Sequence, residues 1–189
     1  AGISSSDLRP GDVKYVDRNN DGVIDEKDRF VLGNGFPRYT FGFTYNLEWK
    51  GFDFGFFIQG VGKRDMMVRG ELVEPFHSNY SYAIYKHQLD FWSPTNTDAR
   101  YPRLAGIGSV SNSNNYGMGS EINRFDGKYL RLKNIQLGYT IPKSLTNKLM
   151  LQRVRAYVNA QNLFTLSKNS WIDPESTEFD SNMGGSANS

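Results

Sequence analysis

From Tyr39 to Trp49 the sequence YTFGFTYNLEW alternates without a break between large apolar side chains and small or polar ones. Only an extended strand places every second residue on the same face, so this period of two predicts a β-strand with one apolar and one polar face. The apolar face consists of Tyr39, Phe41, Phe43, Tyr45, Leu47 and Trp49. A strand so apolar on one side needs a covering layer of protein or lipid.

Three further segments carry the same alternation. FDFGFFIQG follows a tight Lys50-Gly51 turn, so residues 37–62 are predicted to form a hairpin. YLRLKNIQLGYTIP and VRAYVNAQNLFTL are predicted to form a second hairpin over 128–166, joined by KSLTNKLML, which favours a helical turn or two. The alternation changes phase near Asn134, and a β-bulge there would keep the apolar residues on one face.

The connections between these strands alternate between short and long. Residues 63–127, between the hairpins, are far longer than an ordinary connection in a compact domain. Alternating short turns and long loops are typical of outer-membrane barrels, whose strands of about 10 to 14 residues cross the membrane at a tilt. The pattern predicts an all-β fold that is part of a large antiparallel transmembrane β-barrel. An ordinary antiparallel sandwich, which also alternates, is the alternative.

Composition excludes several other classes. Lysine and arginine (22) nearly balance aspartate and glutamate (20) and are scattered, so we expect no nucleic-acid partner. The chain has no cysteine, which excludes disulfides and thiolate metal sites. It has no apolar run near the roughly 20 residues of a transmembrane helix. The first residue is not Met and the last ones are polar, so we expect a piece of a larger protein.

The stretch DRNNDGVIDEKD, residues 17–28, has the register of a calcium-binding loop, with hard oxygen ligands at alternate positions and glycine at the sharp turn. The predicted ligands are Asp17, Asn19, Asp21, the Val23 carbonyl, Asp25 and Asp28. Asp28 stands where such loops usually have Glu. Because the flanking sequence lacks helices, we expect a structural Ca²⁺. The alternative is an Asx-rich surface turn without metal.

Few residues point to substrate binding or catalysis. Aromatic side chains in the long connection could present ring faces to a sugar or peptide, or could pack that connection onto its neighbours. The candidates for substrate binding are Tyr80, Tyr82, Tyr85 and Trp92. The two histidines, His77 and His87, have no sequence context that predicts a nucleophile or metal partner. The sequence therefore predicts that the protein is not an enzyme.

Several stretches, in this order, resemble the C-terminal barrel region of the SusC/RagA-type TonB-dependent outer-membrane transporters. They are GDVKYVDRNNDGVIDEKDRFVLGN, PRYTFGFTYNLEWKGFDFGFFIQGV, DFWSPTNTDARYPRL, YLRLKNIQLGYTIP and VRAYVNAQNLFTLSKNSWIDPE. The resemblance implies a barrel of about twenty-two strands in outer-membrane lipid. It also implies a plug domain that is absent from this chain, a SusD-like surface lipoprotein, TonB, and import of a glycan or oligopeptide nutrient.

In that barrel the short turns would be periplasmic. Residues 1–36, with the calcium-type motif, 63–127 and 167–189 would then be extracellular loops. The competing hypothesis is a secreted calcium-stabilised β-domain that binds glycan or protein. The two differ in whether the apolar faces of the four strands form one continuous band or pack against a second sheet.

Overall fold

The computed structural model describes residues 8–77, 83–117 and 119–176. Contacts within the chain divide it into two compact units. The sheet unit consists of Phe36–Arg64 and Asp126–Pro174. The loop unit consists of Ala1–Gly35, Asp65–Phe125 and Glu175–Ser189.

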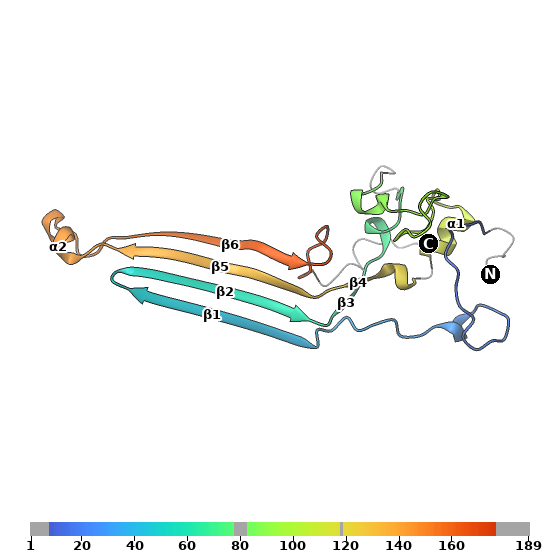
Figure 1. Ribbon diagram of the computed structural model, residues 1–189, viewed down its shortest axis with the longest axis horizontal. Coiled ribbons are helices and arrows are strands. Elements are labelled where there is room, and N and C mark those ends of the chain that lie inside the picture. The colour runs from blue at the N-terminus through green and yellow to red at the C-terminus, as the bar shows by residue number, and fades with distance from the viewer. Residues whose placement is uncertain (1–7, 78–82, 118, 177–189) are drawn as a thin grey trace, which may run out of the picture. The chain divides into compact units, whose positions relative to one another are not determined.

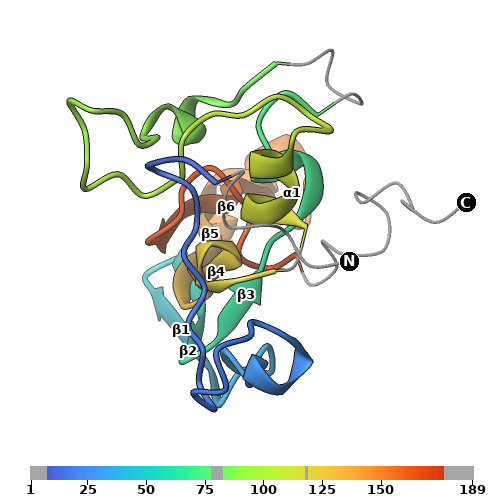
Figure 2. The same ribbon diagram turned by 90° about the vertical axis from the view of Figure 1, so that its right-hand side faces the viewer.

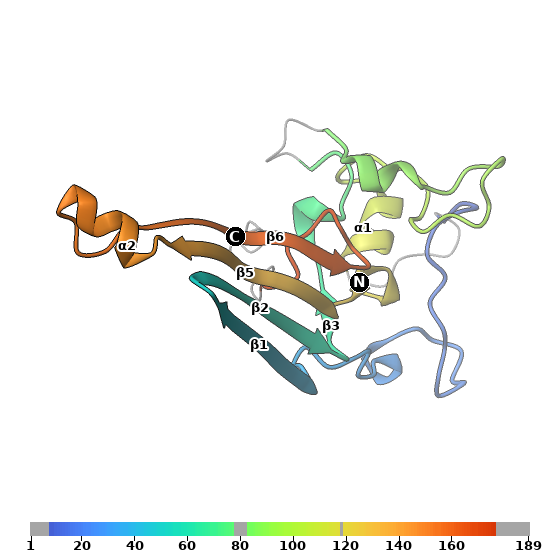
Figure 3. The same cartoon turned by 60° about the vertical axis from the view of Figure 1, so that its left-hand side comes forward.

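The sheet unit is one antiparallel sheet of four long strands in the order β1-β2-β5-β6 (Figure 1). Its strands are β1 (Tyr39–Trp49), β2 (Phe52–Gly62), β5 (Tyr129–Thr140) and β6 (Arg155–Ser167). Figure 3 shows the four strands lying side by side, with β1 and β6 at the edges. These strands lie where the alternation of the sequence predicts them, and the sheet is not closed on itself.

The turn between β1 and β2 has the tight geometry expected from Lys50-Gly51. Both residues have positive φ, 47° and 89°, as the two central residues of a type I′ turn require. The Thr140 amide donates to the Gly51 carbonyl over 2.7 Å, which ties the turn to β5. A Cβ at Gly51 would lie 2.8 Å from the Thr140 oxygen, so glycine is needed here for space as well as for φ.

A bulge interrupts the pairing of β5, as the phase change of the sequence predicts. The register shifts between Leu132 and Asn134 on β5, and opposite it between Phe57 and Ile58 on β2. Lys133 is therefore the extra residue. The bulge keeps the apolar side chains before and after it on one face of the sheet.

The connection from β5 to β6 contains the short helix α2 (Lys143–Thr146) and the 3-10 turn η7 (Asn147–Leu149). Pro142 precedes α2, and Met150 ends the segment with a φ of 54°. The helical turn or two predicted for KSLTNKLML is therefore confirmed.

The loop unit has little regular structure (Figure 2). It contains the two-stranded sheet β3 (Asp65–Met67) and β4 (Arg124–Asp126), the helix α1 (Val110–Tyr116) and short 3-10 turns. The 3-10 turns are η2 (Glu26–Asp28), η3 (Gly70–Leu72), η5 (Lys86–Leu89) and η6 (Glu121–Asn123). Its buried apolar residues include Val68 and Val73, while α1 buries mostly Ser and Asn side chains. The sequence did not predict α1.

Helices play a minor part in both units. Within the ranges that the structure describes, no helix has the length and apolar character needed to cross a membrane.

Candidate functional site

One face of the sheet is apolar across all four strands. The register aligns Phe43 of β1 with Ile58 of β2, and the same face continues on β5 and β6. This apolar band consists of Tyr39, Phe41, Phe43, Tyr45, Leu47 and Trp49 on β1; Phe52, Phe54, Phe56 and Ile58 on β2; Leu130, Leu132, Ile135, Leu137 and Tyr139 on β5; and Ala156, Val158, Ala160, Phe164 and Leu166 on β6. The band is continuous, as the barrel hypothesis requires.

Much of the apolar band is uncovered within the described residues. Phe43 is 55% exposed, Leu137 53% and Val158 74%. Aromatic neighbours across strands contact one another, with ring centroids 5.9 Å apart for Phe43 and Phe56. Exposing a contiguous apolar surface of this extent to water is unfavourable, so the apolar band is a surface that contacts lipid or protein.

The opposite face of the sheet is polar and held by side-chain pairs. Arg155 forms a bidentate pair with Asp53, at 3.0 Å from Nε and 2.5 Å from an Nη, and Gln136 donates to the same carboxylate over 3.3 Å. Arg131 similarly contacts Asp173 at 2.7 Å. An open cavity of about 790 Å³ lies on this face near the β1–β2 turn and is lined by Asn46, Glu48, Asp53, Gln136, Arg153 and Arg155 among others.

The predicted calcium loop folds through side-chain contacts to backbone amides. The Gly22 amide donates to Asp17 Oδ2 over 2.7 Å, across the turn where Gly22 has a φ of 82°. The Asp21 amide donates to Asn19 Oδ1, and the Val23 amide to Asp21 Oδ1, each over 2.9 Å. These contacts join side chains that the calcium motif assigns as ligands to backbone amides of the same loop.

Asp28 closes the loop. Its Oδ1 accepts from the Arg18 amide over 2.8 Å and its Oδ2 from the Asp25 amide over 2.9 Å. The amides of Asp25 and Arg18 hold the pKa of the Asp28 carboxyl below its ordinary value. Asp25 in turn caps η2 by accepting from the Lys27 amide. Both oxygens of Asp28 thus have backbone partners.

One oxygen of a predicted ligand, Asp17, has no partner in the described part of the chain. Asp17 Oδ1 is excluded from solvent and accepts no hydrogen bond, as expected of an oxygen placed to contact a cation. Lys27 Nζ lies 3.8 Å from both Asp21 and Asp25 and supplies some positive charge. Among the described residues, no three His, Cys, Asp or Glu side chains converge on one point, so the metal site stays a prediction.

The aromatic candidates for substrate binding divide into two groups. Tyr80 and Tyr82 lie outside the described residues. Tyr85 stacks on His87, with ring centroids 5.6 Å apart, and a Cβ on Gly11 would come within 2.3 Å of the Trp92 ring. Trp92 therefore packs against the N-terminal segment, while Tyr85 stacks within its own segment, and their role in substrate binding stays a prediction.

The histidines have local contacts. His87 is half-buried, its Nε2 lies 2.7 Å from the Leu72 carbonyl oxygen, and burial lowers its pKa. His77 Nε2 lies 3.7 Å from Glu74. These contacts, which involve described residues, do not include a nucleophilic side chain.

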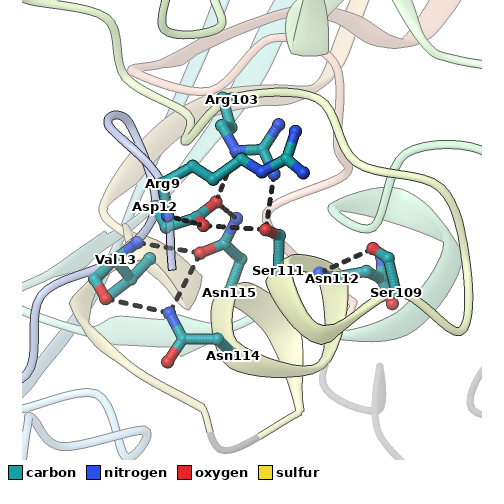
Figure 4. Close-up of polar contacts among 9 residues, drawn as sticks. All are labelled: Arg9, Asp12, Val13, Arg103, Ser109, Ser111, Asn112, Asn114 and Asn115. Carbon is teal, nitrogen blue, oxygen red and sulfur yellow. Dashed lines mark hydrogen bonds and ion pairs between the residues drawn. The ribbon is translucent and has the colours of Figure 1, made fainter. Parts of the chain in front are cut away.

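A polar cluster that the sequence did not predict joins the N-terminal segment to α1 (Figure 4). Asp12 accepts from Arg103 Nε over 2.9 Å, from Ser111 over 2.7 Å and from Asn115 over 3.2 Å. Its second oxygen also accepts from the Arg9 amide over 2.9 Å. Burial acts to raise the pKa of Asp12, but these contacts and the charge of Arg103 outweigh burial and keep that pKa below its ordinary value.

Comparisons with known proteins point to one family. No family model matches the chain. TonB-dependent receptor P3 of Formosa agariphila is 34% identical over 174 residues, which are 90% of this chain and 16% of that protein. TonB-dependent receptor P26 of the same species is 30% identical over 95% of this chain and 18% of its own length. TonB-dependent receptor SusC of Bacteroides thetaiotaomicron is 27% identical over 88% of this chain and 16% of its own length.

Solved structures show the same fold. The RagAB peptide importer in its open-open state superposes with a TM-score of 0.58 at 22% identity, over 85% of this chain and 17% of that chain. A structure of the RagAB peptide transporter gives a TM-score of 0.57 at 21% identity. This chain thus spans less than a fifth of the proteins that it matches. Its sheet has the fold of part of their barrel, and about nine-tenths of the chain is similar in sequence to one segment of outer-membrane TonB-dependent receptors, SusC among them.

Proposed function

We propose that this chain forms part of the barrel wall and surface loops of a transporter that imports a glycan or oligopeptide nutrient in a TonB-dependent manner. The observation that carries the proposal is the apolar band, which runs without interruption across four strands and is backed by a polar face. This is the arrangement of a barrel wall between lipid and a polar lumen. A secreted domain would need a second layer over the apolar band.

The strand dimensions support the same role. β1 has 11 residues. At about 3.3 Å per residue and a tilt near 40°, such a strand rises about 28 Å, close to the apolar height of an outer-membrane barrel. Trp49 and Tyr39 lie at its two ends, where aromatic girdles meet the membrane interfaces.

The mechanism follows from the two faces. The apolar band anchors the wall in lipid, while the polar face, with its Asp53–Arg155 pair, lines the route that the nutrient takes. Loops attached to the opposite end of the strands from the β1–β2 turn would form the extracellular entrance. A SusD-like lipoprotein would cover that entrance, and TonB would act on a plug domain supplied by another part of the protein. No covalent step is assigned to these residues.

Fractionation and uptake test this proposal. An antibody raised to this segment should detect a polypeptide several times its 21.5 kDa in the outer membrane, together with a lipoprotein. Uptake of the nutrient should stop when TonB is deleted. A soluble band near 21.5 kDa would contradict the proposal and favour the secreted domain.

We also propose that the 17–28 loop binds a structural Ca²⁺. The support is the full motif of oxygen ligands and the solvent-excluded, unpartnered Oδ1 of Asp17. Asp17, Asn19, Asp21, Asp25 and the Val23 carbonyl would supply ligands. Asp28 would close the loop and also supply a ligand oxygen, because each of its oxygens accepts one backbone amide and keeps a second lone pair for the ion.

Limited trypsin digestion of the full-length protein tests the calcium proposal, because the loop offers cleavage sites after Arg18, Lys27 and Arg29. Calcium should protect these sites, a chelator should expose them, and Asp17→Asn should remove the difference. Glu26→Gln is the matched control, since Glu26 is not a predicted ligand. Equal cleavage with and without calcium in the wild-type protein would contradict the proposal.

A further inference from the structure

A second cavity lies in the loop unit, away from the acidic loop. Its volume is about 510 Å³. It is lined by Arg9, Arg103, Leu104, Ala105, Gly106, Ser109, Val110 and Ser111. We call it the Arg9–Arg103 cavity. Among the described residues, its lining contains two arginines and no acidic side chain, although the two arginines are 94 positions apart in the sequence.

Arg103 is held rigidly at this cavity. Its Nε contacts Asp12 at 2.9 Å and an Nη contacts Ser111 Oγ at 2.5 Å. The side chain of Asp12 is 1% exposed, and Asp12 is not among the lining residues. Its carboxylate is already occupied by four donors, so it fixes the guanidinium in place without offering an oxygen to the cavity.

Arg9 brings a second positive charge to the same cavity. Its side chain is exposed, and within the described ranges its guanidinium has no ion pair or hydrogen bond. Figure 4 shows both guanidinium groups on the side of Asp12 nearest Ser111. Counting the described residues, two arginines against the one carboxylate of Asp12 give this part of the loop unit a net positive charge of one.

The remaining lining is suited to an organic acid. The Ser109 hydroxyl accepts from the Asn112 amide and keeps its own proton to donate. Leu104, Ala105 and Val110 provide apolar contact for a carbon skeleton. The planar donors of arginine match the oxygens of a carboxylate or sulfate, and the field of two such groups would attract an anionic substrate to the loops.

We propose that the Arg9–Arg103 cavity binds an oxyanion, a carboxylate or sulfate group carried by the nutrient. The proposal rests on the proposed import function and names a chemical class for its substrate. Arg103 is the fixed half of the site. Arg9 is the half that closes on the bound anion.

Arginine-selective modification of the full-length transporter in outer-membrane vesicles tests the site. Phenylglyoxal is applied with sodium sulfate, sodium acetate or sodium chloride at one ionic strength, and peptide mass spectrometry follows each arginine. At ten times the Kd of the anion, modification of Arg9 should slow about tenfold. Arg18 and Arg29, which are exposed and outside the cavity lining, serve as internal controls. Protection by chloride alone, or equal slowing at all three arginines, would overturn the site.

The source of the anion is distinguished with organic ligands in the same assay. Sulfated, uronate-containing and neutral oligosaccharides of one length are compared, together with one peptide in free-acid and amidated forms. The class that protects Arg9 identifies the nutrient chemistry, and equal protection by neutral ligands would overturn the proposal. Arg9→Gln should weaken binding of the protecting ligand about tenfold, the loss of one charge-assisted hydrogen bond. Lys14→Gln, which removes an exposed charge outside the lining, should leave it unchanged.

Uptake separates the failure of this site from failure of the import function. TonB-dependent uptake with no oxyanion protection at Arg9 would overturn the site and leave the importer standing. Protection without TonB-dependent uptake would leave an anion-binding surface and overturn the importer.

Discussion

Replacing Phe43 with arginine should destabilise the protein far more than the same change at Thr44. The two residues are neighbours on β1, but Phe43 lies on the apolar band opposite Ile58, and Thr44 lies on the polar face opposite Phe57. Phe43→Arg would place a cation in lipid, whereas Thr44→Arg would place it in the polar lumen. Strand propensity and position along the membrane normal are nearly the same for both.

The size of the difference follows from the position of Phe43. β1 runs from Tyr39 to Trp49, so Phe43 is one residue from its midpoint. It therefore lies within about 3 Å of the middle of the apolar layer. Arginine at that depth costs about 2–4 kcal/mol, a factor of about 30 to 850 in the folding equilibrium, and the cost is absent on the lumen face. Lost ring contacts with Phe56 would add to it.

The assay is reversible unfolding of the full-length transporter in lipid vesicles by guanidinium chloride. Phe43→Arg should lower the free energy of unfolding by at least about 2 kcal/mol more than Thr44→Arg. Phe43→Leu controls for the loss of the ring. Equal costs for the two arginines, or a larger cost at Thr44, would refute the assignment of the faces.

Three further predictions concern the turn, the bulge and the polar cluster. Gly51→Val places a β-branched residue at positive φ and its Cβ against the Thr140 oxygen. It should therefore lower the free energy of unfolding by about 1–3 kcal/mol or more in the same assay. The control Lys50→Asn should leave the free energy of unfolding unchanged, because Asn readily adopts positive φ. Deleting Lys133 should move the side chains of β5 after the bulge to the opposite face of the sheet and so prevent assembly into the outer membrane. Lys133→Ala keeps the residue count of the strand and should assemble. Blotting of membrane fractions measures both outcomes. Because the pKa of Asp12 is lower in the folded state than its ordinary value of 3.8, its contribution to stability is present above that value and is lost as pH falls below it. The hydrogen-exchange protection factor of α1, which corrects for the intrinsic exchange rate at each pH, should therefore fall over that range in the wild-type protein. An Asp12→Asn variant, which lacks this pH response, is the control.

The strands could be predicted from the sequence because their physical cause is local. A lipid-facing wall forces alternation in every strand, so Tyr39–Trp49 and its partners carry the pattern in their own residues. The phase change near Asn134 likewise predicted the bulge, because a single extra residue is the simplest way to keep Leu132 and Ile135 on one face.

The loop unit could not be predicted in the same way. The α1 sequence VSNSNNY resembles a polar turn, since Ser and Asn are poor helix formers. It is helical because its side chains bond to a segment about 100 residues earlier: Asn114 donates to the Val13 carbonyl over 2.9 Å, and the Val13 amide donates to Asn115 over 2.8 Å. The pairing of Arg9 with Arg103 at one cavity depends on the same long-range contacts.

The acidic loop lies between these cases. Its motif could be recognised from the sequence, and Gly22 has the positive φ expected of the glycine at the sharp turn, whereas metal binding stays a prediction. The contacts of Asp28 could not be predicted from the sequence, because its hydrogen bonds to the amides of Arg18 and Asp25 depend on the conformation of the closed loop.

Spin labels on single cysteines introduced along β1 test the central claim most directly, since this chain contributes no cysteine of its own. The full-length protein is labelled at each position from 39 to 49 in outer-membrane vesicles, and collision rates with oxygen and with a water-soluble nickel complex are compared. A lipid-facing wall predicts a period of two, with odd positions favouring oxygen and even positions favouring the nickel complex. Equal access to the nickel complex at odd and even positions would contradict a membrane wall.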